Sequence, residues 1–572
     1  MKTPTRPNIL QERSHESYDA AELSSVDLKN QFSQRSPALF ILPGMISGLL
    51  FAGIVPAEPT AAISALMLAL LSYTLAKHGK AVLWLVAFTG SCILGFWCYG
   101  TLRLPSPPDS AALSYPPREA RLALTVDRIM QAEDQFGQAT GIARVIDAPA
   151  TSHRNVNNQV FFRLSKKDAS NLNLMRGLTI EVTGILHPIG EDAKADSFEG
   201  YLQRTGIHYT FTRTSKARLL SEAPFFKRLC HETNNRFQGF LRLGESGNKQ
   251  LSQIYIAMLL GKKSELSRDQ TKRFMETGTM HLFAISGLHI GVIATVIWQM
   301  LLVCRLPAKF TPFIGLPLLY FYVEVTGAAP SAVRAFLMVA FFWASIAMRR
   351  QRSPLSALAG SAILVLILQP LQLWQMGFQL SYLVVISILL FGLPLRAQLW
   401  SSLKPNKYIP STDWTHYQKA KYWAADKILL LLAISFSAWL ASAPLSAGFF
   451  GFIAPYAVLI NIMLVNLAAL IISGGVISIT LASLGMEGLA AFLNHSAWLG
   501  ISAMDLTVRL NTKLPGATIE CSNFSSTLSY LGVLAYISSL FTLRVMKHPA
   551  IRFAVPALIV GLTLIIGLLT SG

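Results

Sequence analysis

Long apolar runs constrain the fold of this chain more than any other feature. Three of them, Ala38–Val55, Ala61–Ala76 and Ala81–Tyr99, lie near the N-terminus. A helix needs about 20 predominantly apolar residues to cross a bilayer, allowing for tilt. The sequence therefore predicts a polytopic α-helical membrane protein, with three membrane helices within residues 38–100 and a larger helical core within 278–572. The later spans expected are Phe310–Val325, Ser331–Met348, Leu355–Leu368, Met376–Pro394, Ile428–Phe450, Tyr456–Leu484, Gly488–Leu510, Thr527–Leu543 and Ala554–Leu569.

Basic residues between the runs give the predicted orientation. The chain has 49 Lys and Arg against 30 Asp and Glu, and in membrane proteins such residues mark mainly the cytoplasmic loops. Lys77, His78 and Lys80 place the second loop, and hence the N-terminus, in the cytoplasm. Residues 1–37 lack apolar periodicity and are predicted to form a disordered cytoplasmic tail. Gly488–Leu510 carries several polar residues, and if it lies on the surface every later orientation reverses.

Metal and nucleotide chemistry are not expected from the motifs present. The five cysteines show no CxxC spacing, so we predict no zinc site, no disulfide framework and no cofactor. A phosphate-binding loop is also not predicted, because Lys263 stands where Walker A needs Ser or Thr and Ile256 replaces its first glycine.

Residues 118–218 interrupt the apolar pattern with a polar segment of short alternating strands. Five strands in about a hundred residues are typical of an OB-like barrel, a fold that binds oligonucleotides or oligosaccharides. Because three membrane helices precede it, the topology places this domain outside the membrane. The strands expected are Arg121–Met130, Gly137–Asp147, Gln159–Ser165, Leu178–Pro188 and Ile207–Thr214.

Basic and aromatic residues of this segment are candidates for nucleic-acid binding. Proteins that bind single strands combine cations along the backbone with aromatic platforms that stack on bases. The alternative is that the aromatic rings fill the barrel core and the paired lysines form a solvated turn. The candidates are Arg128, Phe161, Phe162, Arg163, Lys166, Lys167 and Arg176.

Residues 224–277 are predicted to form interfacial helices. Pro224–Leu243 is basic and amphipathic, which is typical of a helix at the membrane surface. Asn248–Leu260 and Ser267–Glu276 follow as two shorter helices, and Ser267 is a suitable cap for the second.

The stretch Thr277–Val292 reads TGTMHLFAISGLHIGV and carries polar residues where a membrane span is ordinarily aliphatic. Polar groups inside a bilayer default to a bundle interior or a hydrated path. His281 and His289 are eight residues apart, close to one face of a helix, and Ser286 and Gly287 permit a kink or close approach. We interpret the stretch as a helix lining a conduit for phosphates. The alternative is a set of polar groups that bond neighbouring helices together.

Arg334, Gln379 and Asn461 are further polar residues inside apolar spans. A guanidinium stays charged in a membrane, so Arg334 needs a partner such as Glu324, an interfacial position, or a role as a phosphate contact. We expect these side chains to converge with His281 and His289 on one path.

The wording AMLLGKKSELSRDQTKRFMETGTMHLFAISGLHIGV resembles the signature of the ComEC competence family. The segments GAAPSAVRAFLMV, QPLQLWQMGFQLSYLVV and APLSAGFFGFIAPYAVLINIMLVNLAAL follow in the family's order. The resemblance implies an inner-membrane channel that admits single-stranded DNA during natural transformation, an OB-like outer domain, and a transport core that includes Gly377–Ser381.

Many members of that family continue into a metallo-β-lactamase-like domain with an HxHxDH motif. This sequence contains no HxHxDH, so we expect a short form that is not an enzyme and has no nuclease activity of its own. The implied partners are single-stranded DNA, the lipid bilayer, an extracytoplasmic DNA receptor, a cytoplasmic motor or strand-capturing protein, and a separate nuclease.

Two other functions fit parts of the sequence. Ser286–Gly287 with His289 nearby suggests an intramembrane serine protease, although Ala284 replaces the first glycine of the rhomboid GxSG pattern. A transporter or assembly factor for another anionic polymer is the third possibility, because OB barrels also bind sugars.

Overall fold

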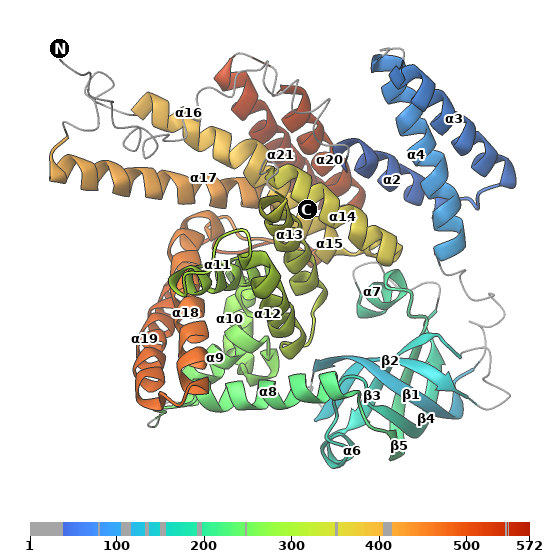
Figure 1. The fold of residues 1–572 in the computed structure, drawn as a ribbon, viewed down its shortest axis with the longest axis vertical. Helices are drawn as coiled ribbons and strands as arrows, with labels where there is room; N and C mark the ends of the chain where they lie inside the picture. Colours follow the sequence, from blue (N-terminus) through green and yellow to red (C-terminus); the bar gives the residue numbers. More distant parts are fainter. Residues whose placement is uncertain are drawn as a thin grey trace, which may run out of the picture.

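The computed structural model describes residues 38–77, 81–104, 116–131, 137–148, 156–190, 197–245, 247, 249–348, 353–403, 414–543, 546 and 548–571. Figure 1 shows three N-terminal helices, a β-barrel and a helical core, with the amphipathic helix α8 extending from the barrel along the core. The predicted tail, 1–37, lies outside the described residues.

The N-terminal helices are α2 (Ala38–Ala52), α3 (Pro59–Lys77) and α4 (Ala81–Arg103). Helix α2 packs closely against α4 because glycine removes side-chain bulk at the contact. A Cβ added at Gly48 would lie 2.4 Å from the carbonyl oxygen of Ile93. Helix α2 also packs against α14, which attaches this group of helices to the core.

The barrel consists of β1 (Arg118–Gln131), β2 (Gln138–Asp147), β3 (Gln159–Ser165), β4 (Thr179–Pro188) and β5 (Tyr209–Ser221). It closes in the order β1-β2-β3-β5-β4, with β4 also paired to β1 and with β3 and β5 parallel. Helix α6 (Lys166–Asn171) connects β3 to β4, and α7 (Phe198–Arg204) precedes β5. Alternate residues fill the interior, including Leu122, Phe162 and Phe211. The predicted OB-like barrel is confirmed.

Three elements connect the barrel to the core: α8 (Phe225–Leu241), α9 (Lys249–Leu260) and α10 (Arg268–Glu276). Ser267 caps α10 in a capping box with Gln270, as predicted. Helix α8 is held against the core by the Asn234 amide, which donates to the carbonyl of Val325 at 2.9 Å.

Among the core helices, α12 to α21 agree with the predicted spans to within about five residues, apart from α16 and α17, which extend further, and α11 begins ten residues after the start of the helix predicted through Thr277–Val292. They are α11 (Gly287–Val303), α12 (Thr311–Val325), α13 (Pro330–Ala347), α14 (Pro354–Leu368), α15 (Met376–Ser387), α16 (Leu393–Leu403), α17 (His416–Phe450), α18 (Ala457–Ser483), α19 (Glu487–Asn511), α20 (Ser526–Thr542) and α21 (Pro549–Ser571). Within the described residues, six helices are long and apolar enough to cross a membrane. The polytopic helical fold is therefore confirmed.

Helix α19 is not one of those six, and it packs along α18. Its Asn494 is fully buried and joins three elements. The side-chain oxygen accepts from Ser478 Oγ of α18 at 2.7 Å, and the amide donates to the carbonyl of Phe240 in α8 at 2.8 Å. These bonds explain Asn494, one of the polar residues that made this segment ambiguous in sequence.

Candidate functional site

The prediction of one helix through Thr277–Val292 is wrong. Helix α10 ends before Thr277, the chain reverses at Gly278 with φ +68°, and Met280–Phe283 forms a 3-10 turn. Helix α11 begins only at Gly287. His281 and His289 therefore belong to different elements. His281 lies exposed on the turn, with Nδ1 3.1 Å from the Gly278 carbonyl oxygen.

Ser286 and His289 form the start of α11. The Ser286 hydroxyl lies 3.0 Å from His289 Nδ1, and the Ser286 amide donates to the same nitrogen at 3.4 Å. The His289 ring is fully buried, and its Nε2 has no hydrogen-bond partner within the described chain. The pair fixes the helix start and leaves one polar ring nitrogen inside the core.

A cavity of about 630 Å³ lies where the barrel meets the core. Arg128, Phe161 and Arg163 line it from the barrel, so three of the predicted nucleic-acid-binding residues come together here. The stretch Thr277–Val292, called the motif below, contributes Phe283, Ala284 and Ile285. The start of α13 contributes Ser331, whose hydroxyl donates to the Ile285 carbonyl at 2.6 Å and so joins the motif to α13.

The cavity has an excess of positive charge. Arg128, Arg163 and Lys263 line it, and no Asp or Glu is found among its described lining residues. Burial, reinforced by the charge of Arg128, lowers the pKa of Lys263. Arg163 Nε is buried and has no acceptor in the described part of the chain. Cations crowded together without carboxylates stabilise an incoming anion.

Aromatic rings lie beside these cations. The Arg163 guanidinium lies 5.8 Å from the centre of the Phe161 ring, which packs edge-to-face against Phe198 at 5.0 Å. Phe161 is almost buried, whereas Phe198 is 44% exposed. Phe198 thus has the more accessible ring, and the strand pattern does not predict it because it lies in α7.

A larger groove of about 1270 Å³ continues from the cavity and shares Gln131 and Lys263 with it. Arg268 and Lys272 of α10 line it, together with Phe449 and Phe450 at the end of α17. The sequence alone does not predict that these residues meet, because α10 and the end of α17 are about 180 residues apart.

The remaining barrel candidates lie elsewhere. Phe162 is fully buried in the barrel interior and has no free face for a base. Lys166 and Lys167 are exposed at the start of α6 and do not line the cavity. Arg176 donates to Glu324 of α12 at 3.0 Å, which connects the barrel to the core.

Arg334 is 3% exposed and does not pair with Glu324. Its guanidinium donates to Gln372 Oε1 at 3.2 Å and to the Gly377 carbonyl at 2.7 Å, while Nε has no partner in the described residues. Gln379 donates to the nearby Leu373 carbonyl at 3.0 Å. The two side chains therefore share the connection between α14 and α15.

Asn461 lies on α18, and within the described residues no hydrogen bond joins it to the connection that holds Arg334 and Gln379. Its Oδ1 is buried and has no donor in the described residues. The expected convergence of all these polar residues on one path is thus not tested by the hydrogen bonds of the structure, and it stays a prediction.

The match to known families settles the relationship of this chain. Residues 258–546, half of its length, match the family described as competence protein. The chain belongs to the competence protein family. The matched region includes the motif, Arg334 and the polar α14–α15 connection, whereas the barrel lies outside it. Of the residues that line the cavity, only those of the core therefore lie within the region that matches the competence family.

Two curated relatives are similar to parts of this competence-family chain. ComE operon protein 3 of Bacillus subtilis (strain 168) is 29% identical over 223 residues, which cover 37% of this chain and 27% of the relative. An uncharacterized protein of Aquifex aeolicus (strain VF5) is 28% identical over 145 residues, covering 25% of this chain and 34% of that protein. The alignments thus span about a third or less of these relatives. No solved structure matches the chain.

Proposed function

We propose that this chain takes part in DNA uptake and carries one DNA strand across the cytoplasmic membrane. The observation that supports this most is the cavity between barrel and core, where Arg128, Arg163 and Lys263 converge without a carboxylate. Membership of the competence protein family supports a role in DNA uptake. A single strand offers phosphates to such cations and bases to the neighbouring rings.

In this proposal the strand runs along the cavity and the adjoining groove. Phosphates contact Lys263, which lines both, while bases stack on Phe198 and on the exposed Phe450. Arg334 Nε and His289 Nε2 are buried and have no hydrogen-bond partner in the described residues. They are the candidates for contacts during passage, together with Gln379 and Asn461.

The orientation and the partners belong to the same proposal. The basic loops support an orientation with the N-terminus inside and the barrel outside the cell. Moving one charge through 100 mV costs about 2.3 kcal/mol, so each nucleotide enters against an interior-negative potential. A cytoplasmic motor or strand-capturing protein then draws the strand inward, an extracytoplasmic receptor delivers it, and a separate nuclease removes the other strand.

The test measures strand binding by the detergent-purified full chain as a function of salt. For single-stranded DNA, the logarithm of the binding constant falls linearly with the logarithm of the salt concentration. The steepness of that line decreases by about 0.7 for each phosphate contact removed. Replacing Arg128, Arg163 and Lys263 together with alanine is therefore expected to reduce the slope by about 2. The matched control is Arg121→Ala, an exposed barrel cation paired with Glu181 outside the cavity. An unchanged slope in the triple variant refutes the cavity as the binding site.

The test in cells measures cytosolic uptake of labelled DNA by a naturally competent strain that lacks its own competence protein. Complementation by the unaltered chain and by Arg121→Ala is expected, and the triple variant is expected to fail at equal membrane abundance. Uptake by all three chains alike would refute the proposal.

One observation favours the protease alternative, since Ser286 Oγ and His289 Nδ1 are 3.0 Å apart. Catalysis of this kind also needs a group that orients the histidine and access for substrate. His289 is fully buried, and its other nitrogen has no partner in the described chain. Ser286→Ala separates the functions, because a conduit retains DNA uptake whereas a protease loses all activity.

A further inference from the structure

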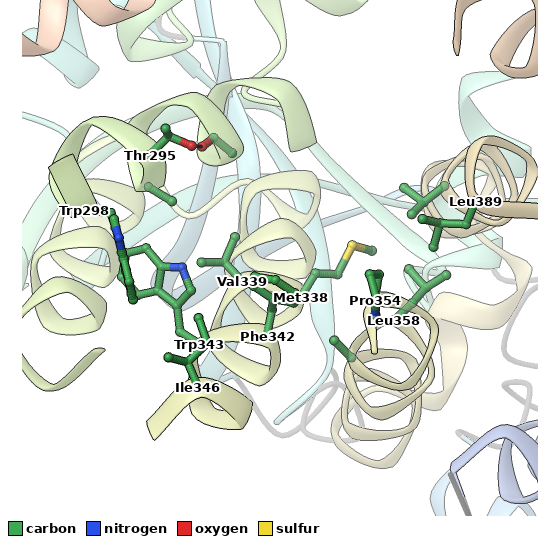
Figure 2. Close-up of a pocket in the computed structure, with 14 residues that line it drawn as sticks. Thr295, Trp298, Met338, Val339, Phe342, Trp343, Ile346, Pro354, Leu358 and Leu389 are labelled. Atoms are coloured by element: carbon green, nitrogen blue, oxygen red, sulfur yellow. Dashed lines mark hydrogen bonds between the residues drawn. The ribbon is translucent and has the colours of Figure 1, made fainter. Parts of the chain in front are cut away.

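An apolar cavity of about 480 Å³ lies within the membrane helices, apart from the cation-lined site. Figure 2 shows its lining, with Thr295 and Trp298 of α11, Met338 and Phe342 of α13, and Leu358 of α14 around the space. Thr295 contributes the main polar side-chain atom of this wall, and its hydroxyl already donates to the Gly291 carbonyl at 2.8 Å. The wall therefore offers a ligand almost only hydrocarbon contacts.

The dimensions of the cavity correspond to part of one membrane leaflet. Its lining runs from Gly291 to Trp298 on α11 and from Met338 to Ile346 on α13. At 1.5 Å per residue, these segments are about 10 to 12 Å long. One leaflet contributes roughly 15 Å to the hydrocarbon core, so the cavity accommodates about two thirds to four fifths of the length of an acyl chain in that leaflet.

The end of the cavity near the helix termini has the features of a membrane interface. Trp298 and Trp343 pack together with ring centres 5.1 Å apart, four or five residues before their helices end. Tryptophan is enriched at that level, where its ring is apolar and its N–H meets polar lipid groups. Trp298 Nε1 is buried and has no acceptor in the described chain. Arg305 follows directly after α11 and is exposed.

We infer that this cavity binds one acyl chain of a bilayer phospholipid, taken from the leaflet beside the α11–α12 connection. The chain lies between α11, α13 and α14, with its ester end at the level of Trp298 and Trp343. The lipid thereby becomes part of the packing of α11, the helix that begins with Ser286 and His289. This inference does not depend on the proposed passage of DNA.

Gly291 provides the test, because a Cβ added there meets no atom within 4 Å. Gly291→Leu fills the cavity and also favours the helix, since glycine is a poor helix former. The matched control is Gly561→Leu in α21, where an added Cβ is equally free and which does not line the cavity. Thr295→Leu is a second filling variant if the first fails to fold.

The measurement is quenching of tryptophan fluorescence by phospholipids brominated along the acyl chain, with the full chain in nanodiscs. The signal of Trp298 and Trp343 is obtained by difference from a variant with phenylalanine at both positions. We expect quenching that saturates at a low fraction of brominated lipid and falls at least twofold in Gly291→Leu but not in Gly561→Leu. Quenching that rises linearly with lipid fraction, or is equal in both variants, overturns the inference.

Discussion

Glu324 holds the barrel and the core together, and its neutralisation tests that role directly. The carboxylate is 8% exposed and accepts from Arg176 of the barrel at 3.0 Å and from Lys227 of α8 at 2.5 Å. Tyr320 donates to its other oxygen at 3.1 Å. Glu324→Gln keeps the size of the side chain and removes the charge, so both cations lose their common partner.

The free energy that Glu324→Gln is expected to cost lies between the values for breaking exposed and buried ion pairs. Exposed pairs contribute about 0.2–1 kcal/mol, and breaking a buried one costs about 3–5 kcal/mol. The two cations are 23% and 27% exposed, so solvent compensates part of the loss and we expect about 2–3 kcal/mol. Since 1.4 kcal/mol is a factor of ten, local opening becomes roughly 30- to 150-fold more frequent.

The native Cys230 can be used to measure this local opening, so no cysteine has to be introduced. It lies one turn after Lys227 on α8 and is 4% exposed, and burial raises the pKa of its thiol. In a chain whose other four cysteines are replaced, maleimide labelling of Cys230 is expected to accelerate by the same 30- to 150-fold estimate. The control is Glu181→Gln, which breaks the exposed Arg121 pair on the barrel and should leave the rate unchanged. Equal rates in both variants would refute the connecting role of Glu324.

Three further outcomes are expected. Arg334→Lys should reduce DNA uptake roughly tenfold at equal membrane abundance. The guanidinium reaches the Gln372 and Gly377 oxygens from two separate nitrogens, a forked geometry that the single nitrogen of lysine does not reproduce, and one bond to a charged group contributes about 1.5 kcal/mol. Phe162→Ala should destabilise the barrel by about 3–5 kcal/mol, seen as a lower melting temperature, with little effect from Lys167→Ala. Burial lowers the pKa of His208, so the unfolded barrel binds the proton more readily than the folded one. Barrel stability should therefore fall as the pH drops below about 6.5. Thermal melts at several pH values check this, and His208→Gln should flatten the pH dependence.

The sequence by itself determined the elements of this protein. The local periodicity of apolar residues predicts the membrane helices and the alternating strands, because burial in lipid or in a barrel core selects apolar side chains every turn or every second residue. For this reason the strands from Arg118 to Ser221 and the helices from Thr311 to Ser571 agree with the patterns. The prediction of one helix through Thr277–Val292 failed because apolar side chains continue through the 3-10 turn Met280–Phe283 and across Ala284 and Ser286, whose backbone is extended.

Only the tertiary structure decided which polar groups meet. Glu324 is ten residues from Arg334, yet it pairs with Arg176, 148 residues away. Adjacent aromatic residues in a strand point to opposite faces, but closure of the barrel decided that Phe162 fills the interior and Phe161 faces the cavity. A buried charge takes whichever partner the packed helices bring within hydrogen-bond distance, and that choice depends on contacts distant in sequence.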